Sequence, residues 1–287
     1  MKRQFKGALH IHTTISDGRK SPEETLEAYK SAGYDFVALT DHWSYGEAGE
    51  YKGMQILSGI EYDTGNSIVD GIFHIVGIGM ERKPSLVRTD LNNFTNSVER
   101  AQHIINCIND AGGAAILAHP AWSVNRPSDI LKLHGLAGVE IYNGVSGYPF
   151  GNRANSAVIL DTLAADDYIL PVHAADDTHF WEGEECSSFV LTTERNFVQA
   201  IKDGNLYASR GPRMEIKREG NTLHIECSPA SAIIIQTCSV WIDGRILIGD
   251  GITSRDYTIK PNDLFARVEV VDKDGNTAWS GYYKYIY

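Results

Sequence analysis

The stretch FKGALHIH, residues 5–12, is a short apolar run that ends in two histidines. Side chains alternate along a strand, so residues two apart point to the same face. His10 and His12 would therefore point the same way, as two ligands of one metal ion must. Among ten histidines in the chain such a pair is weak evidence by itself. A surface coincidence is the alternative, and the rest of the sequence has to decide.

Short β-branched runs alternate with helix-like segments up to about residue 205, which is typical of a parallel sheet or barrel. Seven strands are predicted, at Phe5–His10, Phe36–Thr40, Ile56–Gly59, Phe73–Gly77, Ala115–Ala118, Gly138–Ile141 and Tyr168–Val172. Helices are predicted from Pro22 to about Ala32 with Ser21 as the N-cap, over Leu91–Asp110, and near Asn152–Ala165 and Glu194–Asp203. The fold class is therefore α/β.

After Ser209-Arg210-Gly211-Pro212 the pattern changes to closely spaced strands with turn signals. Strands are predicted at Leu223–Cys227, Ala232–Gln236, Val240–Ile242, Tyr257–Ile259 and Ala266–Val271. We predict a first domain over residues 1–212 and a small all-β, sandwich-like domain over residues 213–287. Its role stays open between a module that buttresses the first domain, an interface of a homo-oligomer, and a ligand-binding module.

The composition excludes several classes of protein. No stretch approaches the roughly 18 apolar residues of a membrane span, and the four cysteines lack CxxC spacing, which argues against a zinc knuckle or a disulfide framework. We expect a cytoplasmic protein that does not bind membranes. The net charge of −11 argues against an extended nucleic-acid partner. If the substrate is an anion, a local positive field has to receive it.

Nearly every predicted strand delivers a histidine or carboxylate, most of them at its C-terminal end, whereas His74 lies on the fourth strand. They are His10, His12, Asp17, His42, Glu61, His74, His119, Asp177 and His179. In a β/α barrel the carboxyl ends of the strands form the active-site mouth, so these side chains should converge there. Asp176 is an alternative to Asp177, but only Asp177 has the i, i+2 spacing to His179. Chance would require at least six coincidences, so we interpret the set as a metal site.

The motifs HxH, SDG, TDH, GIE, FH, AHP and DxH occur in this order, and they resemble those of the PHP (polymerase and histidinol phosphatase) superfamily over roughly residues 5–212. They are His10-Ile11-His12, Ser16-Asp17-Gly18, Thr40-Asp41-His42, Gly59-Ile60-Glu61, Phe73-His74, Ala118-His119-Pro120 and Asp177-Thr178-His179. Residues 200–212 and Ala278-Trp279-Ser280 also resemble a subgroup with a C-terminal β-domain. The resemblance implies a distorted seven-stranded β/α barrel that binds three divalent transition-metal ions.

The resemblance also implies how the ligands divide. His10, His12, Glu61 and Asp177 would hold one ion; Glu61, His74 and His119 a second; Asp17, His42 and His179 the third. Glu61 would bridge two ions.

Imidazole and carboxylate ligands without thiolates suit Zn, Mn or Fe. A water that bridges two such ions is deprotonated near neutral pH and can act as the nucleophile, while the positive charges neutralise phosphoryl oxygens. We therefore expect a metal-dependent phosphoesterase with a small phosphorylated substrate, either a monoester or a diester. An amidohydrolase-like C–N hydrolase is the alternative, but it would want a bridging lysine where the chain has His74. A non-catalytic metal-binding module is another alternative.

Further site residues are open to two interpretations. Glu61 is the predicted catalytic carboxylate, and His173 is a candidate general base, with a buried structural histidine as the alternative. Arg19, Arg153 and Arg210 are candidates for binding a phosphate. Asn143 is either a strand cap or a substrate contact. Trp122 and Trp181 follow metal motifs, and each forms either a wall for a ring or part of the core.

Overall fold

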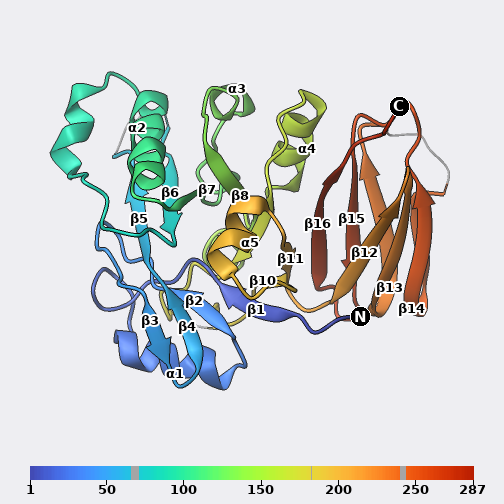
Figure 1. Ribbon diagram of the computed structural model, residues 1–287, viewed down its shortest axis with the longest axis horizontal. Coiled ribbons are helices and arrows are strands. Elements are labelled where there is room, and N and C mark those ends of the chain that lie inside the picture. The colour runs from blue at the N-terminus through green and yellow to red at the C-terminus, as the bar shows by residue number, and fades with distance from the viewer. Residues whose placement is uncertain (66–70, 182, 240–243) are drawn as a thin grey trace.

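The strands of the chain divide between two sheets in the computed structural model, which describes residues 1–65, 71–181, 183–239 and 244–287 (Figure 1). The five-stranded sheet has the order β5 (Gly59–Asp63), β6 (His74–Ile78), β7 (Ala114–Leu117), β8 (Leu136–Asn143) and β9 (Val172–Ala175). The first part of the larger sheet contains β1 (Phe5–Ala8), β2 (Phe36–Ala38), β3 (Gly49–Tyr51), β4 (Met54–Leu57), β10 (Phe189–Thr192) and β11 (Tyr207–Ser209).

The two sheets meet at isolated bridges where strands end. Ile11 pairs with Thr178, and His42 pairs with Glu61. Strands β1, β2 and β4 are parallel, as are β7, β8 and β9, whereas β6 runs antiparallel to both of its neighbours. The mixed α/β class is confirmed. The distorted seven-stranded β/α barrel is not confirmed, because the described strands form two sheets of mixed direction.

The third predicted strand, Ile56–Gly59, is wrong in its extent. The chain leaves one sheet after Leu57 and enters the other at Gly59, so Glu61 lies in the middle of β5 instead of at a strand end. Gly59 allows this transfer since a Cβ atom there would lie 2.3 Å from the carbonyl oxygen of Leu39. The seventh strand is also displaced, from the predicted Tyr168–Val172 to β9, because residues beyond the end of α4 form a turn at Asp167 with φ 66°.

The helices are α1 (Pro22–Ser31), α2 (Ser97–Asp110), α3 (Pro127–Ile130), α4 (Ala157–Ala165) and α5 (Phe197–Asp203). The predicted start of α1 is confirmed, with Ser21 and Glu24 in a reciprocal capping box. The predicted helix Leu91–Asp110 is too long at its start. Residues Arg88–Asn93 form a 3₁₀ turn, η1, and α2 begins only after Asn96, whose side chain accepts a hydrogen bond from the Glu99 amide.

The C-terminal strands continue the larger sheet. They are β12 (Met214–Glu219), β13 (Thr222–Thr237), β14 (Ile246–Thr258), β15 (Ala266–Val271) and β16 (Thr277–Tyr283). They enclose a core of their own that includes Leu223, Ile233 and Val268. Strand β16 pairs with β11, so hydrogen bonding continues across the predicted domain boundary, and the division at residue 212 stays a prediction. The predicted strand Val240–Ile242 lies outside the described residues.

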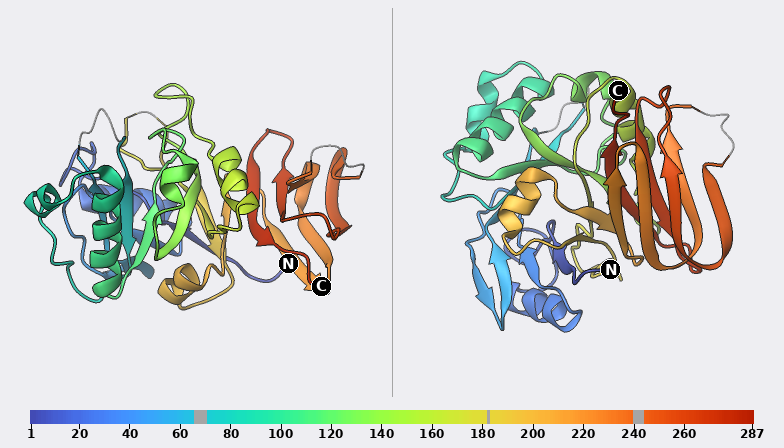
Figure 2. Two further views of the ribbon diagram at one scale, coloured as in Figure 1. Left: turned by 90° about the horizontal axis from the view of Figure 1, so that it is seen from above. Right: turned by 45° about the vertical axis from the view of Figure 1, so that its right-hand side comes forward.

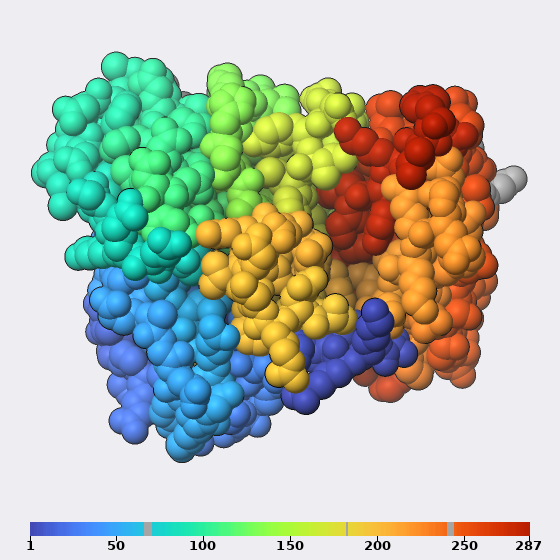
Figure 3. Space-filling view, viewed as in Figure 1, coloured from blue at the N-terminus to red at the C-terminus, as the bar shows by residue number. Residues whose placement is uncertain are grey.

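Side-chain contacts also hold the C-terminal strands to the rest of the chain. The Gln4 side chain donates to the Met214 carbonyl (2.8 Å), and Figure 3 shows the N-terminal segment, in dark blue, against the orange strands. Helix α4 lies beside β15 and β16 in both views of Figure 2, where Arg267 makes two hydrogen bonds to Asp161. No helix among the described residues is both long enough and apolar enough to cross a membrane.

Candidate metal centre

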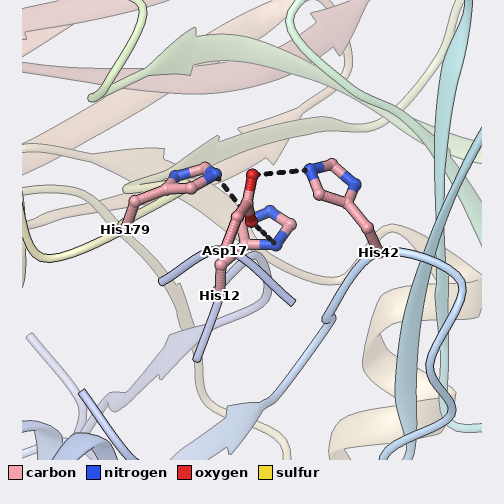
Figure 4. Close-up of side chains that lie close together, drawn as sticks. All are labelled: His12, Asp17, His42 and His179. Carbon is pink, nitrogen blue, oxygen red and sulfur yellow. Dashed lines mark ion pairs between the residues drawn. The ribbon is translucent and has the colours of Figure 1, made fainter. Parts of the chain in front are cut away.

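All nine predicted ligands come together in three adjoining groups. In each group one ligand atom per residue lies within 4.8 Å of the others. The groups are His10, His12, Glu61 and Asp177; Glu61, His74 and His119; and His12, Asp17, His42 and His179. The third group is drawn in Figure 4, where the three imidazoles surround the Asp17 carboxylate. Glu61 belongs to two groups, as the motifs imply, and His12 also joins two.

Strand geometry explains the convergence. The Ile11–Thr178 bridge keeps the backbone extended beyond β1, so His10 and His12 point to the same side. His74 is the first residue of β6, not its last. Because β6 is antiparallel to β5 and β7, its amino end meets the same edge of the sheet as the carboxyl end of β7, which His119 follows.

The central atoms lie close together without hydrogen bonds. His10 Nε2 and His12 Nε2 are 3.1 and 3.0 Å from Asp177 Oδ1, and 3.3 and 3.1 Å from Glu61 Oε2. His42 Nδ1 is 2.9 Å from Glu61 Oε2. These five buried atoms have no hydrogen-bond partner. A buried polar atom left in this state costs about 1–3 kcal/mol, so a cluster of five requires compensation.

The histidines are held by the nitrogen that faces away from the cluster. His10 Nδ1 pairs with Glu140 Oε1 at 2.7 Å, His119 Nδ1 with Ser123 Oγ at 3.0 Å, and His179 Nδ1 with the Asp177 carbonyl oxygen at 2.9 Å. The Nε2 atoms of these three residues then face carboxylates of the cluster at 3.1–3.7 Å. Metal-binding histidines in proteins are anchored in this way, so the residues present fit divalent cations.

Glu140 and Asn143 support the cluster from β8. Besides His10, Glu140 accepts hydrogen bonds from the His119 amide (2.9 Å) and from Asn143 Nδ2 (2.8 Å). Asn143 Nδ2 also lies 3.2 Å from Asp177 Oδ2, and its Oδ1 accepts from Ser146. The Asn143 side chain is fully buried and is not among the described residues that line the site cavity. A substrate contact of Asn143 therefore stays a prediction that these contacts do not support. Sequence reasoning missed the role of Glu140, although its place at the end of a predicted strand was a signal.

Two further aspartates arrange the loops. Asp41 accepts hydrogen bonds from the backbone and hydroxyl groups of both Thr13 and Ser16, which fixes the loop that carries Asp17. Asp176 faces the opposite way from its neighbour and accepts from the Tyr29 hydroxyl at 2.7 Å and the Ser188 amide at 2.6 Å. Asp177, and not Asp176, thus belongs to the cluster.

The charges of the cluster stabilise one another. Burial lowers the pKa of His10, but Asp177, Glu61 and Glu140 outweigh this and raise it well above the usual value. Burial raises the pKa of Glu61, but His10 and His74 outweigh this and bring it well below the usual value. The hydrogen bond from His179 lowers the pKa of Asp17 to about 2. The carboxylates are therefore ionised at neutral pH, and protons compete with cations for the imidazoles.

His173 does not belong to the site. It lies on β9 with its ring against Gly138, where an added Cβ atom would come within 2.2 Å of the ring. The side chain is buried, neither ring nitrogen has a hydrogen-bond partner, and burial lowers the pKa to about 4. His173 is not among the described residues that line the site cavity, so the predicted role as a catalytic base gains no support from this geometry and stays a prediction.

A cavity of about 280 Å³ opens above the cluster. Its lining consists of Asp17, His42, Glu61, His74, His119, Trp122, Val145, Ser146, Phe150, Asp177, His179 and Trp181. Both tryptophans line the cavity, which is compatible with the first of the two predicted roles.

The three arginines expected to bind phosphate are absent from this lining. The Arg19 guanidinium lies 3.5 Å from the Trp181 carbonyl oxygen, the Arg153 side chain is exposed, and Arg210 stacks on Tyr142 at 4.6 Å. The structure thus does not bring the arginines to the cluster.

Known proteins resemble this chain in part. No family model matches it. It is 34% identical over 79 residues to phosphoribosyl 1,2-cyclic phosphate 1,2-diphosphodiesterase from Eggerthella lenta, covering 25% of the chain and 30% of that protein. It is also 34% identical over 80 residues to DNA polymerase/3'-5' exonuclease PolX from Bacillus subtilis, covering 21% of the chain and 14% of that protein. The chain thus spans less than a third of the length of either relative.

A solved structure matches nearly the whole fold. A two-domain protein from Bacteroides vulgatus that contains a predicted PHP-like metal-dependent phosphoesterase aligns with 98% of this chain and 94% of its own, with a TM-score of 0.50 and 15% identity. At this identity the match shows the fold alone. With the sequence matches, it confirms the predicted resemblance to the PHP superfamily.

Proposed function

We propose that this chain is a metal-dependent phosphoesterase that hydrolyses a small phosphate monoester or diester. The nine clustered residues would hold three divalent transition-metal ions, Zn, Mn or Fe, at the mouth of a distorted seven-stranded barrel. The proposal also covers a small-molecule substrate and a cytoplasmic location. The hydrolysis of phosphodiesters by the Eggerthella lenta relative, as its name states, supports the choice of reaction.

One observation carries the proposal. Five buried nitrogen and oxygen atoms of His10, His12, His42, Glu61 and Asp177 lack hydrogen bonds. Their imidazole nitrogens lie 2.9–3.3 Å from carboxylate oxygens of Glu61 or Asp177. The set contains imidazole and carboxylate groups without a thiolate, which suits the proposed ions.

The chemistry of these ions fits phosphate-ester hydrolysis. When bound, they lower the pKa of water and neutralise the charge that develops on the phosphoryl group. No lysine or arginine is among the described residues that line the cavity, so a phosphate needs these cations.

The side chains of the protein orient the site. The hydrogen bond to Glu140 fixes the ring of His10, so that His10 Nε2 faces the cluster. Glu61 is a member of two ligand groups and so connects them. The amidohydrolase-like alternative receives no support from strand β6, where His74 stands in place of a lysine.

Metal analysis followed by an activity panel tests the proposal. The purified protein should carry two to three equivalents of transition metal, and it should hydrolyse aryl phosphates or phosphodiesters in Mn, Fe or Zn. Chelation should remove the activity and the same metal should restore it. Protein that takes up no metal on titration, or metal-loaded protein that cleaves no ester of the panel, contradicts the proposed function.

A further inference from the structure

The walls of the site cavity differ in character from its floor. The floor consists of residues of the ligand cluster, whereas the walls contain Ser146 and four apolar side chains, those of Trp122, Val145, Phe150 and Trp181. These four side chains come from loops that follow β7, β8 and β9. Three of the four are aromatic, so a substrate above the cluster meets rings on its sides.

The aromatic walls stand against two different ligand groups. The Trp122 ring lies 5.1 Å from the ring of His119 and 6.1 Å from that of His74. The centroid of the Trp181 ring lies 4.9 Å from that of His179. The Phe150 ring packs edge-on against Trp181, with 5.2 Å between the ring centroids. A phosphate bound at the cluster would thus have Trp122 on the side of His74 and His119, and Trp181 on the side of His179.

These rings are poorly explained as core residues. Trp122 is 45% exposed and Phe150 is 39% exposed, although aromatic side chains usually bury most of their surface. A ligand in the cavity would cover apolar surface that now faces solvent, and this burial favours binding.

The described residues that line the walls offer no positively charged side chain to a second anionic group. The described lining contains no lysine or arginine. A substituent with its own carboxylate or second phosphate would lose hydration among Trp122, Val145 and Phe150 without gaining an ion pair, which is unfavourable. The cavity of about 280 Å³ is also at the small end of ligand sites.

From these observations we infer that the ester substituent of the substrate is a single uncharged planar ring, held against Trp122 and Trp181. This inference rests on the proposed function and specifies its substrate class as a phosphate ester of an aromatic or heteroaromatic group without a second charged substituent. The bound cations receive the phosphoryl group, and the tryptophans select what is attached to it. Trp122 and Trp181 are thus specificity-determining residues.

Phosphonates provide a test that does not depend on turnover, because their C–P bond resists hydrolysis. Calorimetric titration of the metal-loaded protein should show that phenylphosphonate binds roughly tenfold more tightly than methylphosphonate, as expected for one aromatic contact. A carboxylate in the para position of the phenyl ring should remove this advantage. The hydrolysis panel should show the same order for phenyl, methyl and carboxyphenyl phosphates.

Variants locate the effect. Trp122→Ala and Trp181→Ala should each reduce the preference for phenylphosphonate to about two- to threefold, whereas Trp122→Phe and Trp181→Phe should retain most of it. Metal content and circular dichroism report whether each variant is folded. Tyr148→Ala is the matched control, since Tyr148 is 90% exposed in the same loop as Phe150 but does not line the cavity. It should leave the preference unchanged.

The outcomes separate the two proposals. Equal binding of phenyl- and methylphosphonate by a protein that still hydrolyses esters overturns the inference and leaves the proposed function standing. A phenyl preference that survives in both alanine variants overturns the role of the tryptophans. If no phosphonate binds and no ester is cleaved by the metal-loaded protein, the proposed function itself fails.

Discussion

Two buried clusters of charged side chains differ in how their charges are satisfied. In the C-terminal strands, Arg267 is fully buried and its guanidinium donates to Asp161 at 2.9 and 3.0 Å and to Glu269 at 2.7 Å. The Tyr282 hydroxyl adds a hydrogen bond to Asp161 at 2.8 Å. In the ligand cluster, five buried atoms have no hydrogen-bond partner. The Arg267 cluster (Asp161, Arg267, Glu269 and Tyr282) is complete by itself, and the ligand cluster is not.

This difference separates a structural role from a binding role. A buried ion pair is tolerated when hydrogen bonds satisfy both partners, as they do between α4 and β15. Nitrogen and oxygen atoms that converge without hydrogen bonds are instead suited to a guest cation. Sequence composition cannot make this distinction, since both clusters consist of ordinary charged residues.

The largest expected effect follows from removing the carboxylate that two ligand groups share. Glu61→Gln should lower metal content and reduce the rate of ester hydrolysis by about 1000-fold or more. This reduction is larger than the usual effect of removing one hydrogen-bond donor that stabilises charge in the transition state. Elemental analysis and an aryl phosphate assay measure both. Glu269→Gln removes a carboxylate from the Arg267 cluster and should keep metal and activity. Wild-type hydrolysis by the Glu61 variant would refute the shared-ligand role.

Breaking the Arg267 cluster should affect stability instead. Arg267→Met leaves the partly buried Asp161 without its guanidinium partner, so the free energy of unfolding should fall by about 1.5–3 kcal/mol, measured by urea denaturation. The double variant Arg267→Met with Asp161→Leu removes both charges and should recover part of the loss. Metal content should stay unchanged in both variants. Loss of metal from a still-folded Arg267 variant would show that the two clusters are coupled.

His173 is a third case, a buried imidazole that belongs to neither cluster. Its pKa is about 4 in the folded chain, against 6.5 as its ordinary value, because burial disfavours the cation. As pH falls, His173 therefore binds a proton in the unfolded chain before it does so in the folded chain. The free energy of unfolding that depends on neutral His173 is fully present above pH 6.5 and decreases by about 3 kcal/mol as pH falls toward 4. His173→Leu should lack this decrease. Urea unfolding at several pH values in chelator tests this, and parallel pH profiles for variant and wild type would contradict it.

The smallest effect concerns the carboxylate behind His10. Glu140→Gln keeps the shape of the side chain but removes its charge, so metal affinity should fall by about 10- to 100-fold while the fold persists. Titration against a chelator of known affinity measures this. Glu269→Gln again serves as the control with unchanged affinity. A Glu140 variant with wild-type affinity would mean that Asn143 and the backbone orient the cluster without it.

The sequence predicted more of the ligand cluster than of the sheets that carry it. The residue types and spacings of the HxH and DxH motifs are local signals, because alternation along an extended chain places His10 with His12 and Asp177 with His179. The direction of β6 and the transfer at Gly59 are not local. They depend on which strands pair, and neither the apolar run of β6 nor that of β4 shows its pairing direction.

The substrate contacts were predicted least well. Arginine chemistry suggested Arg19, Arg153 and Arg210, but the cavity lining holds none of them. For Asn143 the sequence left a strand cap and a substrate contact open, and the structure shows its side chain hydrogen-bonded inside the fold. A polar side chain shows its chemistry in the sequence, but its direction depends on the neighbours that it finds after folding.

By itself the sequence determined which residues form the candidate ligand cluster, the resemblance to one superfamily and the mixed α/β class, because these depend on residue type and short-range spacing. The tertiary structure alone decided which polar atoms lack partners, that Trp122 and Trp181 line the cavity, and that His173 is buried away from it. The physical reason is that hydrogen bonding, burial and exposure are properties of pairs of distant segments, and folding brings those segments together.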